Sequence, residues 1–152
     1  MPTLAELSEQ EARLQFDAFD NLTAWELGTV MRRSAVEQQL PIAIEIRRNG
    51  QLLFHAALAG TGPDNDAWLM RKARVVDRYG VSSLHVGERA RHTGATFEEQ
   101  SRLDPDLYAA HGGAFPVTLR GTGVIGTVAV SGLPQVQDHE FVVSQLALFL
   151  GG

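Results

Sequence analysis

The 152-residue sequence contains no cysteine, so disulfides, thiolate metal sites and a thiol nucleophile are all excluded. It has no excess of basic residues either, because the formal net charge is −5 and the lysines and arginines do not cluster. Nucleic-acid binding is therefore disfavoured, since neutralisation of phosphates supplies most of that affinity. No apolar run approaches the roughly 20 residues that span a bilayer, and the acidic N-terminal segment does not resemble a targeting peptide. We expect a cytoplasmic protein without nucleic-acid or membrane partners.

The remaining composition is that of one globular domain. Hydrophobic residues make up 44% of the chain, and a chain of this length buries enough apolar surface to fold without cross-links. No repeat, linker or low-complexity segment divides the sequence. A single domain over residues 1–152 is therefore expected.

A G-x-G-x-x-G motif, formed by Gly121, Gly123 and Gly126, has the spacing used by dinucleotide-binding proteins. In those proteins a strand precedes the glycines and a helix begins at the third one. Here residues 115–119 alternate apolar and polar side chains, and residues 127–131 are a β-branched run, so both flanks are typical of strands. The motif therefore predicts a β-hairpin that turns at the first two glycines, with no nucleotide site.

A second hairpin is predicted over residues 42–58, because alternating strands flank Asn49-Gly50, the strongest short hairpin signal. Apolar periodicity and capping residues predict the helices. The predicted helices begin at Thr3, at Thr23, at Asn65 or Asp66, at Ser82 or Ser83, and at Asp138. The third of them is expected to end at Tyr79 and the fourth near His92. Residues 93–105 are expected to be irregular, and residues 106–110 are expected to form one helical turn.

Two hairpins separated by helices do not give the strand–helix alternation of a parallel sheet. They indicate an α+β fold with one antiparallel sheet. Because helices both precede and follow the strands, we predict a three-layer α/β/α sandwich.

The predicted helix over residues 65–79 carries the first candidate site. Trp68 and Lys72 share one face, and Arg71 lies beside them. A lysine in an aromatic stripe usually packs its aliphatic stem and extends its ammonium to the rim. Alternatively, Lys72 or Arg71 presents its charge to an acidic ligand or to a facing subunit.

The segment His111-Gly112-Gly113 is the second candidate. It resembles an oxyanion-hole loop, but the chain has no G-x-S-x-G nucleophile motif, so acyl transfer is disfavoured. The two glycines instead allow backbone N–H groups to approach a ligand or another chain closely.

The start of the last predicted helix is the third candidate. Asp138 is expected to cap the helix, and His139 either packs structurally or serves as a ligand or proton-transfer group. The five histidines of the chain have no zinc-binding spacing. A single imidazole is nevertheless sufficient to bind haem iron axially, and His111 is the favoured one.

Several sequence blocks resemble the haem-degrading-domain family, which includes GlcG-like and HbpS-like proteins and the C-terminal haem-binding domain of some cobalamin adenosyltransferases. The chain is most similar to a branch of small bacterial and fungal proteins, and the likeness covers about residues 19–150. The blocks that carry it are Pro63-Asp64-Asn65 with Trp68, Arg71-Lys72, Ser82-Ser83, residues 111–116, residues 121–126, residues 130–134 and Asp138-His139.

The resemblance implies a profilin-like fold with a five-stranded antiparallel sheet, assembly into homo-oligomers and haem as the candidate cofactor. Only four strands are evident in the sequence, so the fifth is expected within residues 93–103 or near Ala59.

Three hypotheses follow. The first is an oligomeric small-molecule-binding protein for haem or a related planar anionic ligand, the second a homo-oligomeric scaffold without a ligand, and the third a haem-degrading enzyme. The expected ligand-binding residues are Asn65, Trp68, Arg71, Lys72, His111, Gly112, Gly113, Asp138 and His139.

Overall fold

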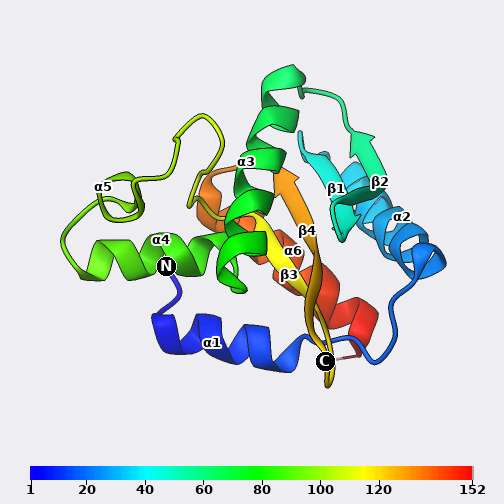
Figure 1. Cartoon of the computed structure of the whole chain (residues 1–152). Helices are drawn as coiled ribbons and strands as arrows, with labels where there is room; N and C mark the ends of the chain where they lie inside the picture. The colour runs from blue at the N-terminus through cyan, green and yellow to red at the C-terminus, as the bar shows by residue number, and fades with distance from the viewer. Residues whose placement is uncertain (152) are drawn as a thin grey trace.

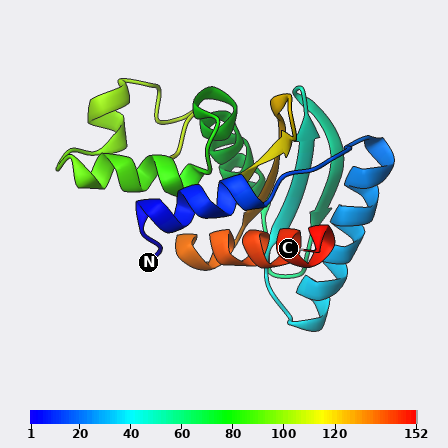
Figure 2. The same cartoon turned by 90° about the horizontal axis from the view of Figure 1, so that it is seen from below.

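A computed structural model describes residues 1–151. The single domain is predicted over residues 1–152, and its last residue, Gly152, lies outside the described residues. The strands form one antiparallel sheet in the order β2-β1-β4-β3, and helices cover both of its faces (Figures 1 and 2). The elements are α1 (Leu4–Arg13), α2 (Asn21–Glu37), β1 (Ala43–Arg48), β2 (Gln51–Ala57), α3 (Pro63–Tyr79), α4 (Ser83–His92), α5 (Phe97–Ser101), β3 (Ala114–Leu119), β4 (Gly123–Ser131) and α6 (Gln135–Leu150).

Both predicted hairpins are confirmed. Asn49 and Gly50 have φ angles of 51° and 81°, as expected for the tight turn between β1 and β2. The first two glycines of the G-x-G-x-x-G motif turn the chain between β3 and β4. The third, Gly126, is required by packing, because a Cβ there would lie 2.0 Å from the carbonyl oxygen of Arg47 on neighbouring β1.

The main hydrophobic core lies between the sheet and the layer formed by α2 and α6. It contains Leu27 and Met31 of α2, Leu146 of α6 and the side chains of Ile44 and Val128 from the sheet. A smaller cluster joins Leu69 and Val76 of α3 to alanines on the opposite face. The α/β/α layering predicted from the order of elements therefore agrees with the packing.

The expectation of a five-stranded sheet is wrong, because the described residues form four strands. Neither proposed location holds the fifth, since residues 97–101 form α5 and β2 ends at Ala57. On the outer side of the edge strand β3, Phe16 forms a single parallel bridge to Leu119, the one isolated bridge within residues 1–151. Its amide donates to the carbonyl of Thr118 and its own carbonyl accepts from Arg120, both at 2.8 Å.

The helices differ from the predictions at several boundaries. Helix α2 begins at Asn21, because Asp20 is the N-cap and Thr23 completes the capping box from inside the helix. Helix α3 begins at Pro63, a residue well suited to a first turn. Residues 105–107 form only a turn, not the helical turn expected over 106–110. Within residues 1–151 we find no helix that combines the length and apolarity needed to cross a bilayer.

Candidate functional site

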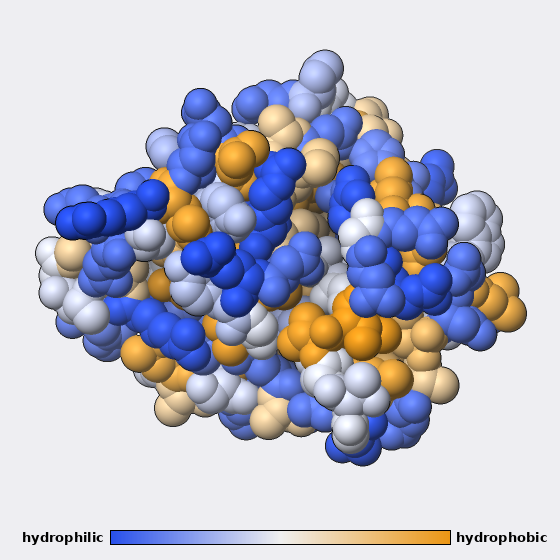
Figure 3. Space-filling model, in the orientation of Figure 1, coloured by the Kyte–Doolittle hydropathy of each residue, from blue (hydrophilic) through white to orange (hydrophobic). Residues whose placement is uncertain are grey.

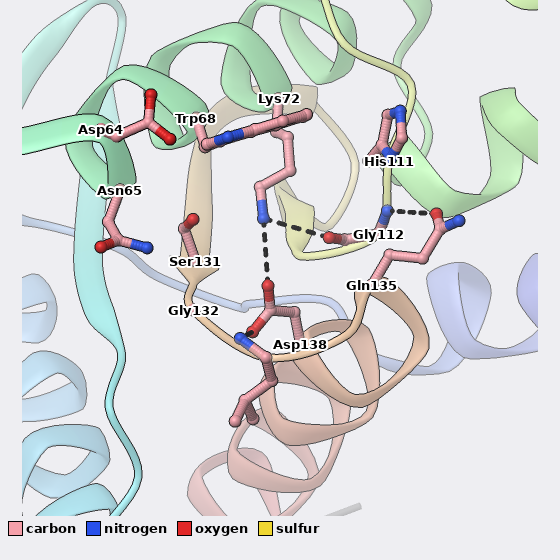
Figure 4. A pocket seen from close by; sticks show the side chains of 11 residues that line it. Asp64, Asn65, Trp68, Lys72, His111, Gly112, Ser131, Gly132, Gln135 and Asp138 are labelled. Atoms are coloured by element: carbon pink, nitrogen blue, oxygen red, sulfur yellow. Dashed lines mark hydrogen bonds and ion pairs between the residues drawn. The ribbon is translucent and has the colours of Figure 1, made fainter. Parts of the chain in front are cut away.

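A cavity of about 270 Å³ opens at the end of the sheet where β4 finishes. Three of the predicted site segments meet there: the start of α3, the loop before β3 and the start of α6 (Figure 4). The lining residues are Asp64, Asn65, Trp68, Lys72, His111, Gly112, Ser131, Gly132, Leu133, Gln135 and Asp138.

Lys72 lies at the floor of this cavity and is only 2% exposed, so the expectation that its ammonium extends to the rim is wrong. Nζ donates to the carbonyl oxygens of Val130 at 2.5 Å and Gly112 at 3.1 Å, and to Oδ2 of Asp138 at 3.4 Å. These three acceptors match the three N–H donors of an ammonium group. Lys72 therefore joins three segments that are distant in the sequence, and its donors are occupied within the protein.

Asp138 is not the N-cap of the last helix, as the sequence suggested, because α6 already begins at Gln135. Its buried carboxylate accepts from the backbone N–H of Leu133 at 3.0 Å through Oδ1, and from Lys72 through Oδ2. Burial raises the pKa of Asp138 and lowers the pKa of Lys72, while the attraction between the two groups opposes both shifts. The pair fixes the loop between β4 and α6 against α3.

Gly112 and Gly113 form the wall between Lys72 and α6. The N–H of Gly112 donates to Oε1 of Gln135 at 3.0 Å. A Cβ on Gly112 would lie 2.3 Å from the carbonyl oxygen of Gln135, and a Cβ on Gly113 would lie 2.3 Å from Nζ of Lys72. Close packing within the chain thus explains both glycines, and the Gly112 N–H predicted to contact a ligand is already bonded.

Trp68 and His111 form the rim of the cavity, with their rings edge to face and their centroids 5.2 Å apart. His111 is exposed, and its ring has no hydrogen bond to any residue between 1 and 151. Partial desolvation by the surrounding protein lowers its pKa, and the positive charges of Lys72 and Arg71 add to this effect, whereas Glu98 opposes it. The lowered pKa favours the neutral imidazole, whose nitrogen lone pair can bind a metal or accept a hydrogen bond.

Two other predicted residues contribute differently. The guanidinium of Arg71 lies 4.3 Å from the centroid of Trp68 and donates twice to the carbonyl of Pro105, at 2.8 and 3.1 Å. It therefore supports Trp68 from outside the cavity. Asn65 lines the cavity and accepts from the N–H of Gly62 at 2.9 Å through Oδ1, which closes the start of α3.

His139 lies outside the cavity lining and is 1% exposed. Its Nε2 is 2.8 Å from Oε1 of Gln10 on α1, and its Nδ1 has no partner within residues 1–151. Burial, together with the charge of nearby His85, lowers its pKa to about 4. The side chain therefore remains neutral and packs α6 against α1.

The lowered pKa of His139 predicts that the free energy of unfolding decreases at acidic pH. Because the pKa of His139 is lower in the folded chain than its ordinary value of 6.5, the unfolded chain binds more protons between pH 6.5 and pH 4. The contribution of His139 to the free energy of unfolding is therefore complete above pH 6.5 and is lost as the pH falls toward 4. We expect a decrease of about 2–3 kcal/mol over this interval, measured by urea unfolding.

His139→Gln removes the titrating group but keeps an amide that can donate to Gln10, so it should flatten this pH profile. His92→Gln is the matched control, because His92 is exposed at the end of α4. An identical pH profile in the wild-type protein and His139→Gln would contradict the assignment.

Gln135 and Ser131 line the cavity but were not among the predicted ligand-binding residues. Placing the helix start at Asp138 concealed Gln135, although Pro134 was a signal for an earlier start.

The structure brings the N-termini of α3 and α6 to the same cavity. In α3, Pro63 has no N–H, the N–H of Gly62 donates to Oδ1 of Asn65, and the N–H of Asn65 donates to the carbonyl of Gly62. The start of α6 has no side-chain cap, so its N–H groups and the positive ends of both helix dipoles favour an anion there, although Asp64 at the rim opposes it.

Comparison with known proteins identifies relatives over nearly the full chain. The family described as haem degrading protein HbpS-like matches residues 19–147. A "UPF0303 protein" of Streptomyces coelicolor is 61% identical, covering 99% of this chain and 95% of its own. Among solved structures, the Ybr137w protein has a TM-score of 0.89 at 34% identity, over 98% of this chain and 88% of its own.

A more distant structure, titled a PduOC:heme complex, has a TM-score of 0.63 at 20% identity, over 86% of this chain and 92% of its own. At this identity the likeness concerns the fold.

Proposed function

The chain belongs to the HbpS-like haem-degrading family, and from this premise we propose that it is a cytoplasmic small-molecule-binding protein for haem or a related planar anionic ligand. The observation that carries this proposal is the composition of the cavity at the end of β4. It combines the free imidazole of His111, the indole of Trp68, the N-terminus of α3 and the uncapped N-terminus of α6.

The chemical groups of these residues suit the binding of haem. One imidazole is sufficient to hold haem iron axially, and His111 has a free ring nitrogen at the rim. Trp68 offers an aromatic surface for stacking, and the starts of α3 and α6 suit the haem carboxylates. Bound haem would supply an iron centre for oxygen chemistry.

The size of the cavity limits the ligand. At about 270 Å³ it lies near the lower end of the range for small-molecule pockets. A molecule as large as haem would therefore extend beyond it, with its outer part at the exposed rim. A smaller planar acid would be enclosed more completely, which is why the proposal covers both.

Titration with haemin tests this function. We expect a saturable Soret shift at micromolar haemin, weakened about tenfold or more in His111→Ala, because the axial nitrogen is lost. Trp68→Ala should weaken binding by a smaller factor, as it removes stacking but keeps the iron ligand.

His92→Ala provides the matched control, since His92 is an exposed histidine outside the cavity. No Soret shift with the wild-type protein, or equal shifts in His111→Ala and the wild type, would exclude haem as the ligand. Biliverdin-like products under reducing conditions would identify the family's degrading activity in this chain.

A homo-oligomeric scaffold is the second candidate, and the surface of α2 favours it. Leu22, Trp25 and Val36 are 61%, 60% and 48% exposed, and their spacing places them on the same side of the helix. Large apolar side chains gathered in this way commonly mark a protein interface. Sedimentation velocity measures the assembly directly, and a monomer at all concentrations would exclude this candidate.

A further inference from the structure

A second hollow lies on the α3 face of the sheet, away from the cavity at the end of β4. Helix α3 packs mainly over β4, β3 and β1 and reaches the edge strand β2 through Asp66, whose Oδ1 lies 2.7 Å from Nε2 of His55. The recess between α3 and the β1–β2 hairpin is visible on the face shown in Figure 3. It has a volume of about 270 Å³ and is lined by Glu45, Arg47, Leu52, His55, Asp66, Leu69 and Met70.

Glu45 is the unusual member of this lining. It is 3% exposed, in the middle of β1, on a sheet face where the neighbouring β4 residue is Ala129. Oε1 is paired with the guanidinium of Arg47, but Oε2 has no hydrogen-bond partner within residues 1–151. Burial raises the pKa of Glu45, and Arg47 opposes this shift. A buried carboxylate oxygen without a donor is costly for the fold, so a donor supplied by a ligand would stabilise it.

The charged groups around Glu45 favour a cation. Asp66 lies across the hollow, where its Oδ1 is hydrogen-bonded to Nε2 of His55 at 2.7 Å. The lining thus has two carboxyl groups, Glu45 and Asp66, and one guanidinium, that of Arg47, which is already paired with Oε1 of Glu45.

The apolar side chains of the lining indicate which kind of group the rest of the ligand carries. Leu52 and Met70 are exposed at the opening, and Leu69 forms the buried inner wall. Their side chains offer an aliphatic surface beside Glu45. Glu45 is itself part of the lining, so a ligand in the hollow lies next to its carboxyl group.

We propose that this hollow is a binding site for an organic ammonium ion with a short aliphatic chain. The ammonium donates to Oε2 of Glu45 and interacts with Asp66, while the chain packs against Leu52, Leu69 and Met70. This site is independent of the haem site proposed above, because the two linings share no residue.

The test is a titration of the ¹⁵N-labelled protein with n-butylammonium chloride, followed by amide chemical shifts. We expect saturable shifts at millimolar concentration for residues 45, 55, 69 and 70. Glu45→Gln keeps the shape but removes the charge, and should weaken binding about tenfold or more. Asp66→Asn, at the exposed rim, should weaken it severalfold without affecting the fold.

Two controls isolate the role of the ammonium charge and of this hollow. n-Butanol has the same chain without the charge and should cause no saturable shift, and His111→Ala should bind n-butylammonium as the wild type does. Absence of saturable shifts in the wild type, wild-type affinity in both Glu45→Gln and Asp66→Asn, or equal binding of n-butanol would overturn the proposal.

Discussion

Lys72→Met should lower the free energy of unfolding by about 3–5 kcal/mol, the cost of removing one member of a buried ion pair. Methionine fills a similar volume but donates no hydrogen bond. The carboxylate of Asp138 and the carbonyls of Gly112 and Val130 would then lose the donor that they share. In thermal unfolding this corresponds to a decrease in Tm of roughly 10 °C or more.

Arg78→Met is the matched control, because Arg78 is an exposed cation on the same helix, and surface substitutions usually change stability by less than about 0.5 kcal/mol. The double variant Lys72→Met with Asp138→Asn should recover about 1–2 kcal/mol, since no unpaired charge remains buried. The amide oxygen that this second substitution introduces can still accept from the backbone N–H of Leu133. If Lys72→Met were as stable as Arg78→Met, the buried network would have no structural role.

Gly113→Ala is expected to cost roughly 3–5 kcal/mol, because it combines overpacking with backbone strain. Gly113 has a φ of +132°, and a Cβ there would lie 2.3 Å from Nζ of Lys72 and 2.5 Å from the carbonyl oxygen of Val130. Neither neighbour can move without breaking the bond between them. Urea unfolding measures the loss, and the same variant should displace Lys72.

Gly121→Ala isolates the backbone contribution. Gly121 also has a positive φ, of +80°, but no atom lies within 4 Å of a Cβ built there. It should therefore lose only about 1–2 kcal/mol. Equal losses in the two variants would show that contact with Lys72 and Val130 adds nothing to the cost at Gly113.

The sequence signals that predicted the structure correctly are those whose physics is confined to a few neighbouring residues. Asn49-Gly50 predicts its hairpin because two residues with positive φ are sufficient to reverse a strand. The flanks of the G-x-G-x-x-G motif exclude a nucleotide site because alternation of side chains is a property of the strand itself. Capping by Ser82 is likewise a contact over three residues.

Other features depend on residues that are distant in the sequence. Periodicity placed Lys72 on an aromatic face, but its burial arises because Gly112, Val130 and Asp138 supply acceptors 40 to 66 residues away. The described residues form no fifth strand, and the sheet is extended only by a bridge between Phe16 and Leu119 of β3, which lies about a hundred residues further along the sequence. The sequence does not reveal that the carboxylate of Glu45 is buried, because polar and apolar residues alternate around it as in an ordinary half-exposed strand.

The sequence by itself determined the two hairpins, the antiparallel class of the sheet and the family, because these depend on local backbone preferences and contiguous motifs. Only the tertiary structure decided which polar groups are buried and which partners they find. Lys72, Asp138 and His139 were all predicted to act at a ligand site. Lys72 and Asp138 do line the cavity but also bond to each other, whereas His139 lies outside the cavity lining and packs beneath α1. The free energy of a buried polar group depends on acceptors and donors brought together by folding, and no local pattern records them.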